Sequence, residues 1–427
     1  MTSSDDNRPN DNRPNDNPSR DDGERGVLVV GAGPAGAAAA IELARAGRRV
    51  TLIDKATFPR DKCCGDGLTT LALRQLDELG LAPTSVPSWR DVGEAWLRSP
   101  SGREVRLELP PDGRFAAITP RVELDAALVD LARSSGVDVR ERRSFRSVDS
   151  GVDSVSIEVD GPDGIERLDA SWVIAADGMW SPVRRAMGVA DPGYLGEWHA
   201  FRQYVGRVEG SAADRLHVWF DADLLPGYAW SFPLPGGRVN FGFGVLRDGE
   251  RRIQDMKEIW LGLFDRPHIR EALGPNATPE GRHTAWPIPA RIDEATTAVG
   301  RVLFVGDAAM ATDALTGEGI GQALLTGREA ARAIIVADSP VAVRNRYRAA
   351  VEHHLLADHR MSLRLSRVLA REKGARGAIA LLDRAGRWGR TNFARWMFED
   401  EPRAIAVTPG RWHRRLFRRS GAYLAGG

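Results

Sequence analysis

Two adjacent thiols, Cys63 and Cys64, are the first residues of the 427-residue chain that could do chemistry. They lie in FPRDKCCGDGL and are the only cysteines of the sequence. Neighbouring Cα atoms lie about 3.8 Å apart, closer than the roughly 4.4 Å lower limit of ordinary disulfides, so a bridge would be strained. A structural zinc site usually needs four cysteine or histidine ligands. We therefore predict no metal site, and the pair is either loop filler or part of a ligand site.

A glycine pattern near the N-terminus predicts a dinucleotide cofactor. Gly31, Gly33 and Gly36 read G-x-G-x-x-G. Gly31 permits a tight turn, Gly33 lets a pyrophosphate approach the backbone, and Gly36 lets a helix pack closely on a strand. The unpaired N–H groups at the start of that helix bind the anion.

The elements that must position this pattern are readable on both sides of it. A strand is expected over Val27 to Val30, a helix over Ala35 to Ala46, and a second strand over Val50 to Ile53. Asp54 follows the second strand, where a carboxylate can bind ribose hydroxyls. Together with Lys55, these segments form the expected nucleotide end of the site.

Three later segments decide which dinucleotide is bound. They are TPRVELDAAL (Thr119 to Leu128), VIAADGMWSPVRR (Val173 to Arg185) and FVGDAAMATDALTGEGIGQAL (Phe304 to Leu324). With the glycine pattern, they resemble the FAD-contacting segments of the flavoprotein hydroxylase fold over residues 26–335. The resemblance implies that the cofactor is FAD.

Polar residues in these segments are candidate cofactor ligands. Arg121 precedes an amphipathic helix, so its guanidinium either reaches a phosphate or is a solvated surface group. Asp177 and Gly178 end a buried strand, which is a ligand-binding edge in open α/β sheets, although Asp-Gly is also an ordinary turn. Gly306 and Asp307 follow another strand, and the resemblance assigns Asp307 to the ribityl chain.

The helix that opens at Gly317-Glu318-Gly319-Ile320-Gly321 predicts an electrostatic role at the flavin. Bare N–H groups at Gly319 and Ile320 would lie under the pyrimidine edge of the flavin. The positive helix end would then favour an anionic reduced flavin.

Residues 193–290 read as a second unit, an antiparallel sheet. Short runs rich in Val, Phe, Trp and Tyr alternate there with glycine and proline. A hairpin from Glu94 to Leu109 is expected to join this sheet. Tyr228, Trp230 and Phe232 alternate along one strand, so they share a face and form either a cavity wall or ordinary sheet core.

Three motifs taken together resemble the geranylgeranyl reductase family. They are K-x-C-G-x-G-L at residues 62–68, Y-x-W-x-F-P at residues 228–233, and G-D-A-A followed by G-E-G-I. In that family the cysteine loop, here Cys64, Gly65 and Gly67, lines the flavin site, and the aromatic strand borders the substrate cavity. Cys63 is then an extra small residue.

Two differences from related patterns qualify this resemblance. The chain has Ala314 where the reductases commonly carry proline before G-E-G-I. Flavin-dependent halogenases are similar at Phe58-Pro59-Arg60, but their aromatic strand reads W-x-W-x-I-P and is paired with a catalytic lysine. None of the four lysines of this chain is predicted to take that role.

The resemblance implies an FAD-dependent reductase of carbon–carbon double bonds in an isoprenoid (polyprenyl) chain, such as a menaquinone side chain or a prenyl lipid. Cys64 and Tyr228 are the candidate catalytic proton donors. No second glycine pattern opens a nucleotide-binding unit, so the external reductant is NADPH in transit or a reduced protein carrier. The alternatives are an FAD-dependent monooxygenase, either a hydroxylase or an epoxidase, and a non-catalytic prenyl-chain carrier.

The expected fold class is α/β, with a Rossmann-type FAD-binding domain, an inserted antiparallel substrate sheet and a C-terminal helical region. The predicted divisions are a disordered tail (1–25), a discontinuous FAD domain (26–90, 113–192 and 291–340), a substrate domain (91–112 and 193–290) and the helical region (341–427). The tail lacks an apolar core and is made largely of Asp, Asn, Arg and Pro, so it does not read as a signal peptide.

Charge and composition bear on partners and location. The net charge of +1 gives no global attraction to nucleic acid, and two cysteines favour a reducing, cytoplasmic compartment. Residues 384–419 carry ten arginines against three acids, with six Trp and Phe residues between them. This pattern suits either contact with an anionic membrane surface or helices packed on the FAD domain with a solvated arginine face. The pattern leaves the oligomeric state open.

Overall fold

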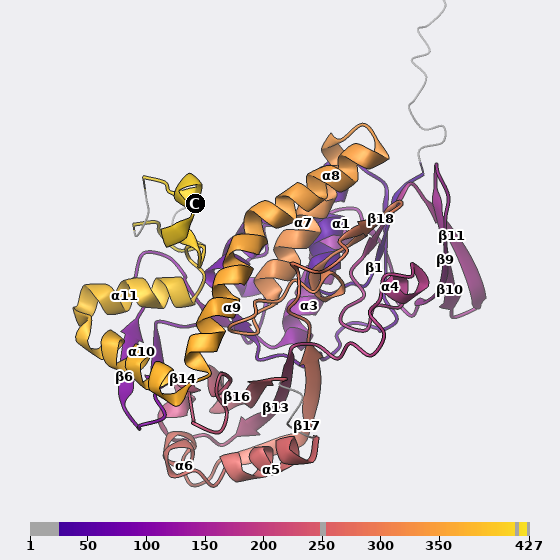
Figure 1. Ribbon diagram of the computed structural model, residues 1–427. Coiled ribbons are helices and arrows are strands. Elements are labelled where there is room, and N and C mark those ends of the chain that lie inside the picture. Colours follow the sequence, from indigo (N-terminus) through magenta and orange to yellow (C-terminus); the bar gives the residue numbers. More distant parts are fainter. Residues whose placement is uncertain (1–24, 248–252, 415–417, 425–427) are drawn as a thin grey trace, which may run out of the picture.

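The computed structural model describes residues 25–247, 253–414 and 418–424 (Figure 1). Residues 1–24 of the tail that we predicted to be disordered lie outside this range. Within the described residues, no helix is both long enough and apolar enough to cross a membrane.

The nucleotide end is built on a six-stranded sheet with the order β18-β19-β12-β1-β2-β8. The central strand β1 pairs in parallel with β2 on one side and β12 on the other, and only the edge pair β18–β19 is antiparallel. Parallel neighbours bring their carboxyl ends to one edge, which is where the glycine pattern lies. The strands are β1 (Val27–Val30), β2 (Val50–Ile53), β8 (Asp138–Arg140), β12 (Trp172–Ala175), β18 (Ala298–Val299) and β19 (Val302–Phe304).

Helices α1 (Pro34–Arg45), α3 (Arg121–Ser134) and α7 (Ile320–Val336) pack around this sheet (Figure 1). The crossing of α1 and α7 is tight, because a Cβ at Gly327 would lie 2.1 Å from the Ala35 carbonyl oxygen. A glycine is therefore required in α7, and the close packing fixes the N-terminal end of that helix relative to the glycine pattern.

The substrate end is a seven-stranded sheet with the order β17-β13-β16-β15-β14-β5-β6. The predicted hairpin β5–β6 joins it, through a parallel pairing of β5 with β14. Its strands are β5 (Glu94–Arg98), β6 (Glu104–Glu108), β13 (Trp198–Gly206), β14 (Leu216–Trp219), β15 (Tyr228–Leu234), β16 (Arg238–Leu246) and β17 (Thr278–Ile288). Helices α5 (Ile253–Leu263) and α6 (Pro267–Leu273) cover its outer face with a buried aromatic cluster.

Two small sheets complete the strands. One has the order β3-β7-β4 and ties the cysteine loop to the segment before α3, and the other has the order β11-β10-β9. Their strands are β3 (Gly67–Leu68), β4 (Arg90–Asp91), β7 (Ala117–Ile118), β9 (Ser144–Ser150), β10 (Val155–Gly161) and β11 (Gly164–Ala170). Short helices α2 (Thr70–Glu78) and α4 (Pro182–Ala186) follow the cysteine loop and β12.

The C-terminal region is helical, as predicted, but it packs in two directions. Helix α8 (Pro340–Val351) lies on α7, whereas α10 (Glu372–Arg384) and α11 (Gly386–Met397) pack on β6 of the substrate sheet. A π-helical turn (Glu352–Leu356) joins α8 to α9 (Ala357–Leu369), which runs between the two ends of the molecule (Figure 1). The predicted α/β class with an inserted antiparallel sheet and helical C-terminus is confirmed.

Candidate active site

A cavity of about 1110 Å³ connects the glycine pattern, the cysteine loop and the aromatic strand. Segments far apart in the sequence therefore meet at one site. Gly36 is the predicted site residue that does not line the cavity. The predicted residues that do line it are Gly31, Gly33, Ala35, Asp54, Lys55, Cys64, Gly65, Gly67, Arg121, Asp177, Gly178, Tyr228, Trp230, Phe232, Gly306, Asp307, Gly319 and Ile320.

The three glycines of the pattern have separable roles. A Cβ at Gly36 would lie 1.8 Å from the Gly31 carbonyl oxygen, and one at Gly31, where φ is +101°, would lie 2.3 Å from the Ala176 oxygen. The chain's own packing requires both glycines. At Gly33 the nearest atoms are guanidinium nitrogens of Arg60 and Arg121, at 3.8 and 4.0 Å. Gly33 is thus kept clear for a ligand.

Positive charge gathers opposite Gly33. Arg121 makes two bonds to the buried Asp125, Nε to Oδ1 at 2.6 Å and a terminal nitrogen to Oδ2 at 2.7 Å, and Arg60 reaches the same carboxylate at 2.9 Å. Helix α1 begins at Pro34 with Gly33 as its N-cap, and no side chain caps its first N–H groups. Two guanidinium groups, one carboxylate and an uncapped helix end fit a pyrophosphate.

Carboxylates stand at the strand ends, as predicted. The two oxygens of Asp54 accept bonds from the N–H groups of Ala32 and Ala56, each at 2.8 Å, which fixes the carboxylate beside the glycine turn. Asp177 accepts bonds from Ser181 Oγ at 2.7 Å and Val183 N at 3.0 Å, and burial raises its pKa to about 6. Asp177 thus caps α4 as well as lining the cavity.

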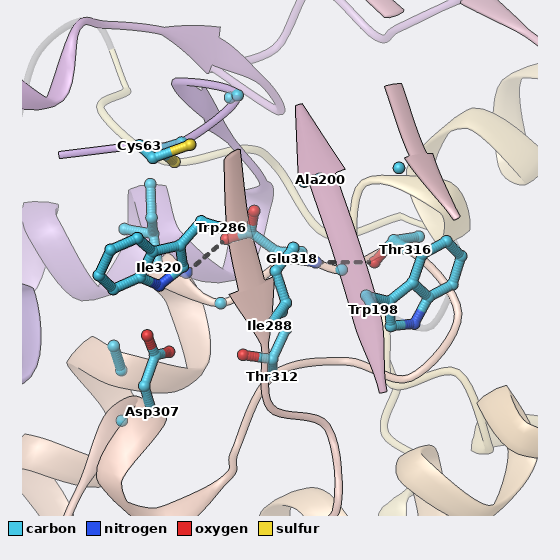
Figure 2. Close-up of a pocket in the computed structure, with 18 of the residues that line it drawn as sticks. Cys63, Trp198, Ala200, Trp286, Ile288, Asp307, Thr312, Thr316, Glu318 and Ile320 are labelled. Carbon is cyan, nitrogen blue, oxygen red and sulfur yellow. Dashed lines mark hydrogen bonds between the residues drawn. The ribbon is translucent and has the colours of Figure 1, made fainter. Parts of the chain in front are cut away.

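The start of α7 differs from the prediction of bare N–H groups. Glu318 Oε1 accepts a bond from Ile320 N at 3.0 Å (Figure 2). It also accepts one from Gly321 N at 3.1 Å, so the carboxylate caps the helix. Burial and the nearby Glu399 carboxylate raise the pKa of Glu318 to about 8. The carboxylate of Glu318, within the G-E-G-I motif, therefore bonds two of the N–H groups that we predicted to be bare.

The loop before G-E-G-I is held firmly although it lacks the family proline. Asp313 Oδ1 accepts bonds from Leu315 N at 3.1 Å and from Thr316 N and Oγ1, both at 2.8 Å. The Ala314 oxygen accepts a bond from Trp198 Nε1 at 3.1 Å. The Trp198 bond fixes the loop against the substrate sheet. Ser362 Oγ of α9 donates to Asp313 Oδ2 at 2.6 Å and fixes the loop against the C-terminal helices.

The cysteine loop packs directly on the aromatic strand. A Cβ at Gly67 would lie 3.1 Å from Phe232, and one at Gly65 would lie 3.4 Å from the same ring. Larger residues at either position would push the ring away. The two glycines therefore let the loop and the wall of the cavity approach each other.

The aromatic strand β15 presents Tyr228, Trp230 and Phe232 to the cavity, as its alternation predicts. The Tyr228 hydroxyl donates to the Thr316 carbonyl oxygen, and Trp230 Nε1 donates to Asn240 Oδ1 at 3.1 Å. The polar atoms of these two side chains are therefore bonded to other protein atoms, and their rings give the cavity an apolar wall.

The C-terminal helices supply a further apolar wall that we did not predict. Helices α9, α10 and α11 line the cavity with Leu365, Val368, Ala378, Ile379, Leu382 and Phe393, among others. The predicted interfacial aromatics are divided: Phe393, Trp396 and Phe398 line the cavity, whereas Trp388 and Trp412 are exposed. Phe417 lies outside the described residues.

Lys62 opens the K-x-C-G-x-G-L motif, but no role was predicted for its side chain. Its Nζ lies 3.6 Å from the centre of the Trp286 ring, and both residues line the cavity. Burial lowers the pKa of Lys62 to about 8. Figure 2 shows Trp286 in the part of the cavity that also contains Asp307 and Ile320.

Comparison with known proteins now identifies the family. A family model described as FAD binding domain matches residues 24–335. The chain is 36% identical over 326 residues to "Menaquinone reductase" of Mycobacterium tuberculosis (strain ATCC 25618 / H37Rv), covering 73% of this chain and 76% of that protein. It is 31% identical over 354 residues to "Digeranylgeranylglycerophospholipid reductase 2" of Methanopyrus kandleri, covering 81% and 86%. The chain belongs to the geranylgeranyl reductase family of FAD-dependent oxidoreductases. FAD is its cofactor, as predicted.

Solved structures show the same fold for this geranylgeranyl reductase family member. A geranylgeranyl bacteriochlorophyll reductase-like protein of Thermoplasma acidophilum superposes with a TM-score of 0.74 and 20% identity, covering 91% of this chain and 99% of that one. The halogenase PltM in complex with phloroglucinol and FAD gives a TM-score of 0.66 and 16% identity, covering 92% of this chain and 85% of that one. At these identities the likeness shows the fold alone.

A buried polar centre, also missed from the sequence, fixes the cysteine loop of this reductase-family protein. Asp66 is fully buried, and its Oδ2 accepts bonds from Tyr204 Oη and Asn240 Nδ2, both at 2.8 Å. Asn240 Nδ2 also donates to the Cys64 carbonyl oxygen at 2.8 Å. Tyr204 and Asn240 of the substrate sheet therefore hold the cysteine loop by hydrogen bonds to its Asp66 carboxylate, and Asn240 also bonds its Cys64 carbonyl.

Replacing Asp66 with asparagine should destabilise the protein by about 2–3 kcal/mol, because an amide NH₂ would face donors that now have an acceptor. Chemical unfolding followed by tryptophan fluorescence measures this loss. The same change at Asp130, whose side chain is 73% exposed, is the control and should cost little. Equal stability of the two variants would contradict the role assigned to Asp66.

Proposed function

We propose that this protein is an FAD-dependent reductase of carbon–carbon double bonds in an isoprenoid chain, with a menaquinone side chain or a prenyl lipid as substrate. The observation that carries the proposal is the change from charged to apolar lining along one cavity. Charged groups line its nucleotide end, and aromatic and aliphatic side chains line the rest, up to α11. An isolated alkene has no polar handle, so a long apolar cavity must orient it. The names of the relatives support the same substrate class.

The residues that would hold FAD are those that line the nucleotide end. Arg121 and the start of α1 at Gly33 would bind the pyrophosphate, Asp54 the ribose, and Asp307 the ribityl chain. The cysteine loop and the Gly319–Ile320 backbone would border the flavin ring. When bound, FAD supplies the hydride that adds to one alkene carbon. The electrons would come from NADPH in transit or from a reduced protein carrier.

The second alkene carbon needs a proton, for which Cys64 is better placed than Tyr228. Burial raises the pKa of the Cys64 thiol to about 12, so the thiol keeps its proton at neutral pH while lining the cavity. The neighbouring Arg121 guanidinium favours the thiolate that donation would leave. The Tyr228 hydroxyl is committed to the Thr316 oxygen. We therefore assign the donor role to Cys64 and a wall role to Tyr228.

Replacing Cys64 with alanine should lower the turnover number by about 10²- to 10⁴-fold, the usual contribution of a positioned acid. The content of bound FAD should remain that of the wild type. Replacing Cys63, its neighbour, with alanine is the matched control, and its turnover should stay within about threefold of wild type. Full activity of the Cys64→Ala enzyme would contradict the donor role and would mean that Cys64 only fills space in the loop.

The chemical outcome separates the proposed function from its rivals. The enzyme is supplied with reductant and a polyprenyl lipid, and the product is analysed by mass spectrometry. A reductase adds the mass of two hydrogen atoms for each bond reduced, whereas a monooxygenase consumes oxygen and adds the mass of one oxygen atom. A carrier returns the lipid unchanged although it binds it.

Isoprenoid lipids reside in membranes, so the proposed function includes peripheral contact with a membrane surface. Basic residues and exposed apolar side chains in the C-terminal region support this part of the proposal.

A further inference from the structure

The apolar end of the cavity reaches the protein surface at the end of α9. Val368 lines the cavity and is also 55% exposed. Beyond it the chain turns into α10, where a Cβ at Gly374 would lie 2.1 Å from the Val368 carbonyl oxygen. The turn is therefore tight, and Val368 marks a place where cavity and exterior meet. Leu381, on the outer side of α10, is 71% exposed.

The surface around this place is strongly basic. Residues 360–394 hold eight arginines and one lysine against two acids, a net formal charge of +7. Arg364 lies one turn before Val368 on α9, and Arg371 follows the end of that helix as the N-cap residue of α10. Exposed arginines therefore lie on both sides of the exposed valine along the chain. Among the described residues, Arg364, Arg367 and Arg371 make no ion pair with a carboxylate.

Helices α10 and α11 form a corner of the molecule away from α1 and the nucleotide sheet (Figure 1). The exposed Val368 and Leu381, surrounded by basic side chains, are complementary to an anionic bilayer. Such a bilayer has phosphates at its surface and hydrocarbon beneath them. A water-soluble acidic partner would satisfy the arginines but would not explain an exposed apolar residue continuous with an apolar cavity.

We propose that the arginine-rich face of α9 and α10 docks on an anionic lipid bilayer, so that a prenyl chain passes from the bilayer into the cavity beside Val368. The docking is inferred from the exposed arginines and apolar side chains of this face. The passage of a prenyl chain rests on the proposed function.

Vesicle sedimentation tests the docking without any substrate. The purified flavoprotein is mixed at low salt with vesicles of phosphatidylglycerol and phosphatidylcholine, or of phosphatidylcholine alone. We expect it to pellet only with the anionic vesicles and to be released by salt, because screened charges attract weakly. The Arg364→Glu/Arg371→Glu double variant should bind at least about tenfold more weakly. Arg146→Glu/Arg167→Glu, on β9 and β11, is the control and should bind as wild type does.

A second pair of variants tests the apolar contact. Leu381→Glu should weaken vesicle binding, whereas Leu261→Glu, at an equally exposed leucine (71%) on α5, should not. Both variants should keep wild-type FAD content and reduce detergent-dispersed lipid normally, while Leu381→Glu alone slows with lipid in vesicles. Equal pelleting with neutral vesicles, or wild-type binding by the Arg364→Glu/Arg371→Glu variant, would overturn the docking. Correct docking without any alkene reduction would instead overturn the proposed function.

Discussion

Replacing Ala378 with tryptophan should nearly abolish reduction of long polyprenyl chains while sparing short ones. Ala378 lies on α10 and lines the apolar end of the cavity with Ile379 and Leu382. An indole at this position would fill the space that the distal isoprene units need, whereas a short substrate would still reach the cysteine loop. We expect kcat/KM for a long chain to fall at least about 100-fold relative to a geranyl substrate.

The control for this substitution is Ala385→Trp, at an exposed position that ends α10. Its ratio of long-chain to short-chain kcat/KM should match the wild type when both substrates are dispersed in detergent. FAD content and the unfolding temperature report whether α10 still packs. An equal loss for both chain lengths in a folded, FAD-replete enzyme would mean that the distal cavity does not hold the chain.

Replacing Gly33 with aspartate should abolish FAD binding without unfolding the protein. Its Cβ has room, since the nearest atoms are guanidinium nitrogens at 3.8 and 4.0 Å. The new carboxylate would pair with Arg60 and Arg121 and would repel the pyrophosphate that these groups are proposed to bind. We expect FAD affinity to fall at least about 100-fold, equivalent to about 3 kcal/mol.

The ratio of flavin to protein after purification and a fluorescence titration with FAD measure this effect. Gly93→Asp is the control, because Gly93 is exposed, has no atom within 4 Å of its Cβ position and is remote in sequence from the pattern. Stoichiometric FAD in the Gly33→Asp protein would show that the pyrophosphate does not approach this turn.

The parts of the site that could be predicted from the sequence are those in which neighbouring residues carry the information. The strand, turn and helix around Gly31 are a local pattern, and the period of two in Tyr228, Trp230 and Phe232 determines their common face. Each of these residues lines the cavity. Their spacing alone was sufficient, because no distant partner decides which way they point.

The parts that could not be predicted depend on partners far along the chain. The bond between Asn240 and Asp66 joins residues 174 positions apart. Asp66 occupies an unspecified position of the K-x-C-G-x-G-L motif, and Asn240 belongs to none of the motifs. Glu318 belongs to the G-E-G-I motif, but the motif does not determine where its side chain points. In the structure the carboxylate accepts bonds from N–H groups of the helix that follows it.

The C-terminal helices illustrate the same limit on a larger scale. The sequence shows that α10 and α11 have apolar and basic faces, but it does not show what the apolar faces cover. The two interpretations considered were a membrane and the FAD domain. In the structure Ile379 and Phe393 instead line the cavity against the substrate sheet. Amphipathicity predicts that a face is buried and leaves its partner undetermined.

The central claim is tested most directly by anaerobic reoxidation of the flavin. The FAD-loaded enzyme is reduced with dithionite, mixed without oxygen with a polyprenyl quinone whose ring is already reduced, and followed by flavin absorbance. The account predicts that the oxidised flavin spectrum returns and that the lipid gains the mass of two hydrogen atoms for each flavin oxidised. A flavin that stays reduced until oxygen enters, with a lipid that then gains the mass of one oxygen atom, would contradict it.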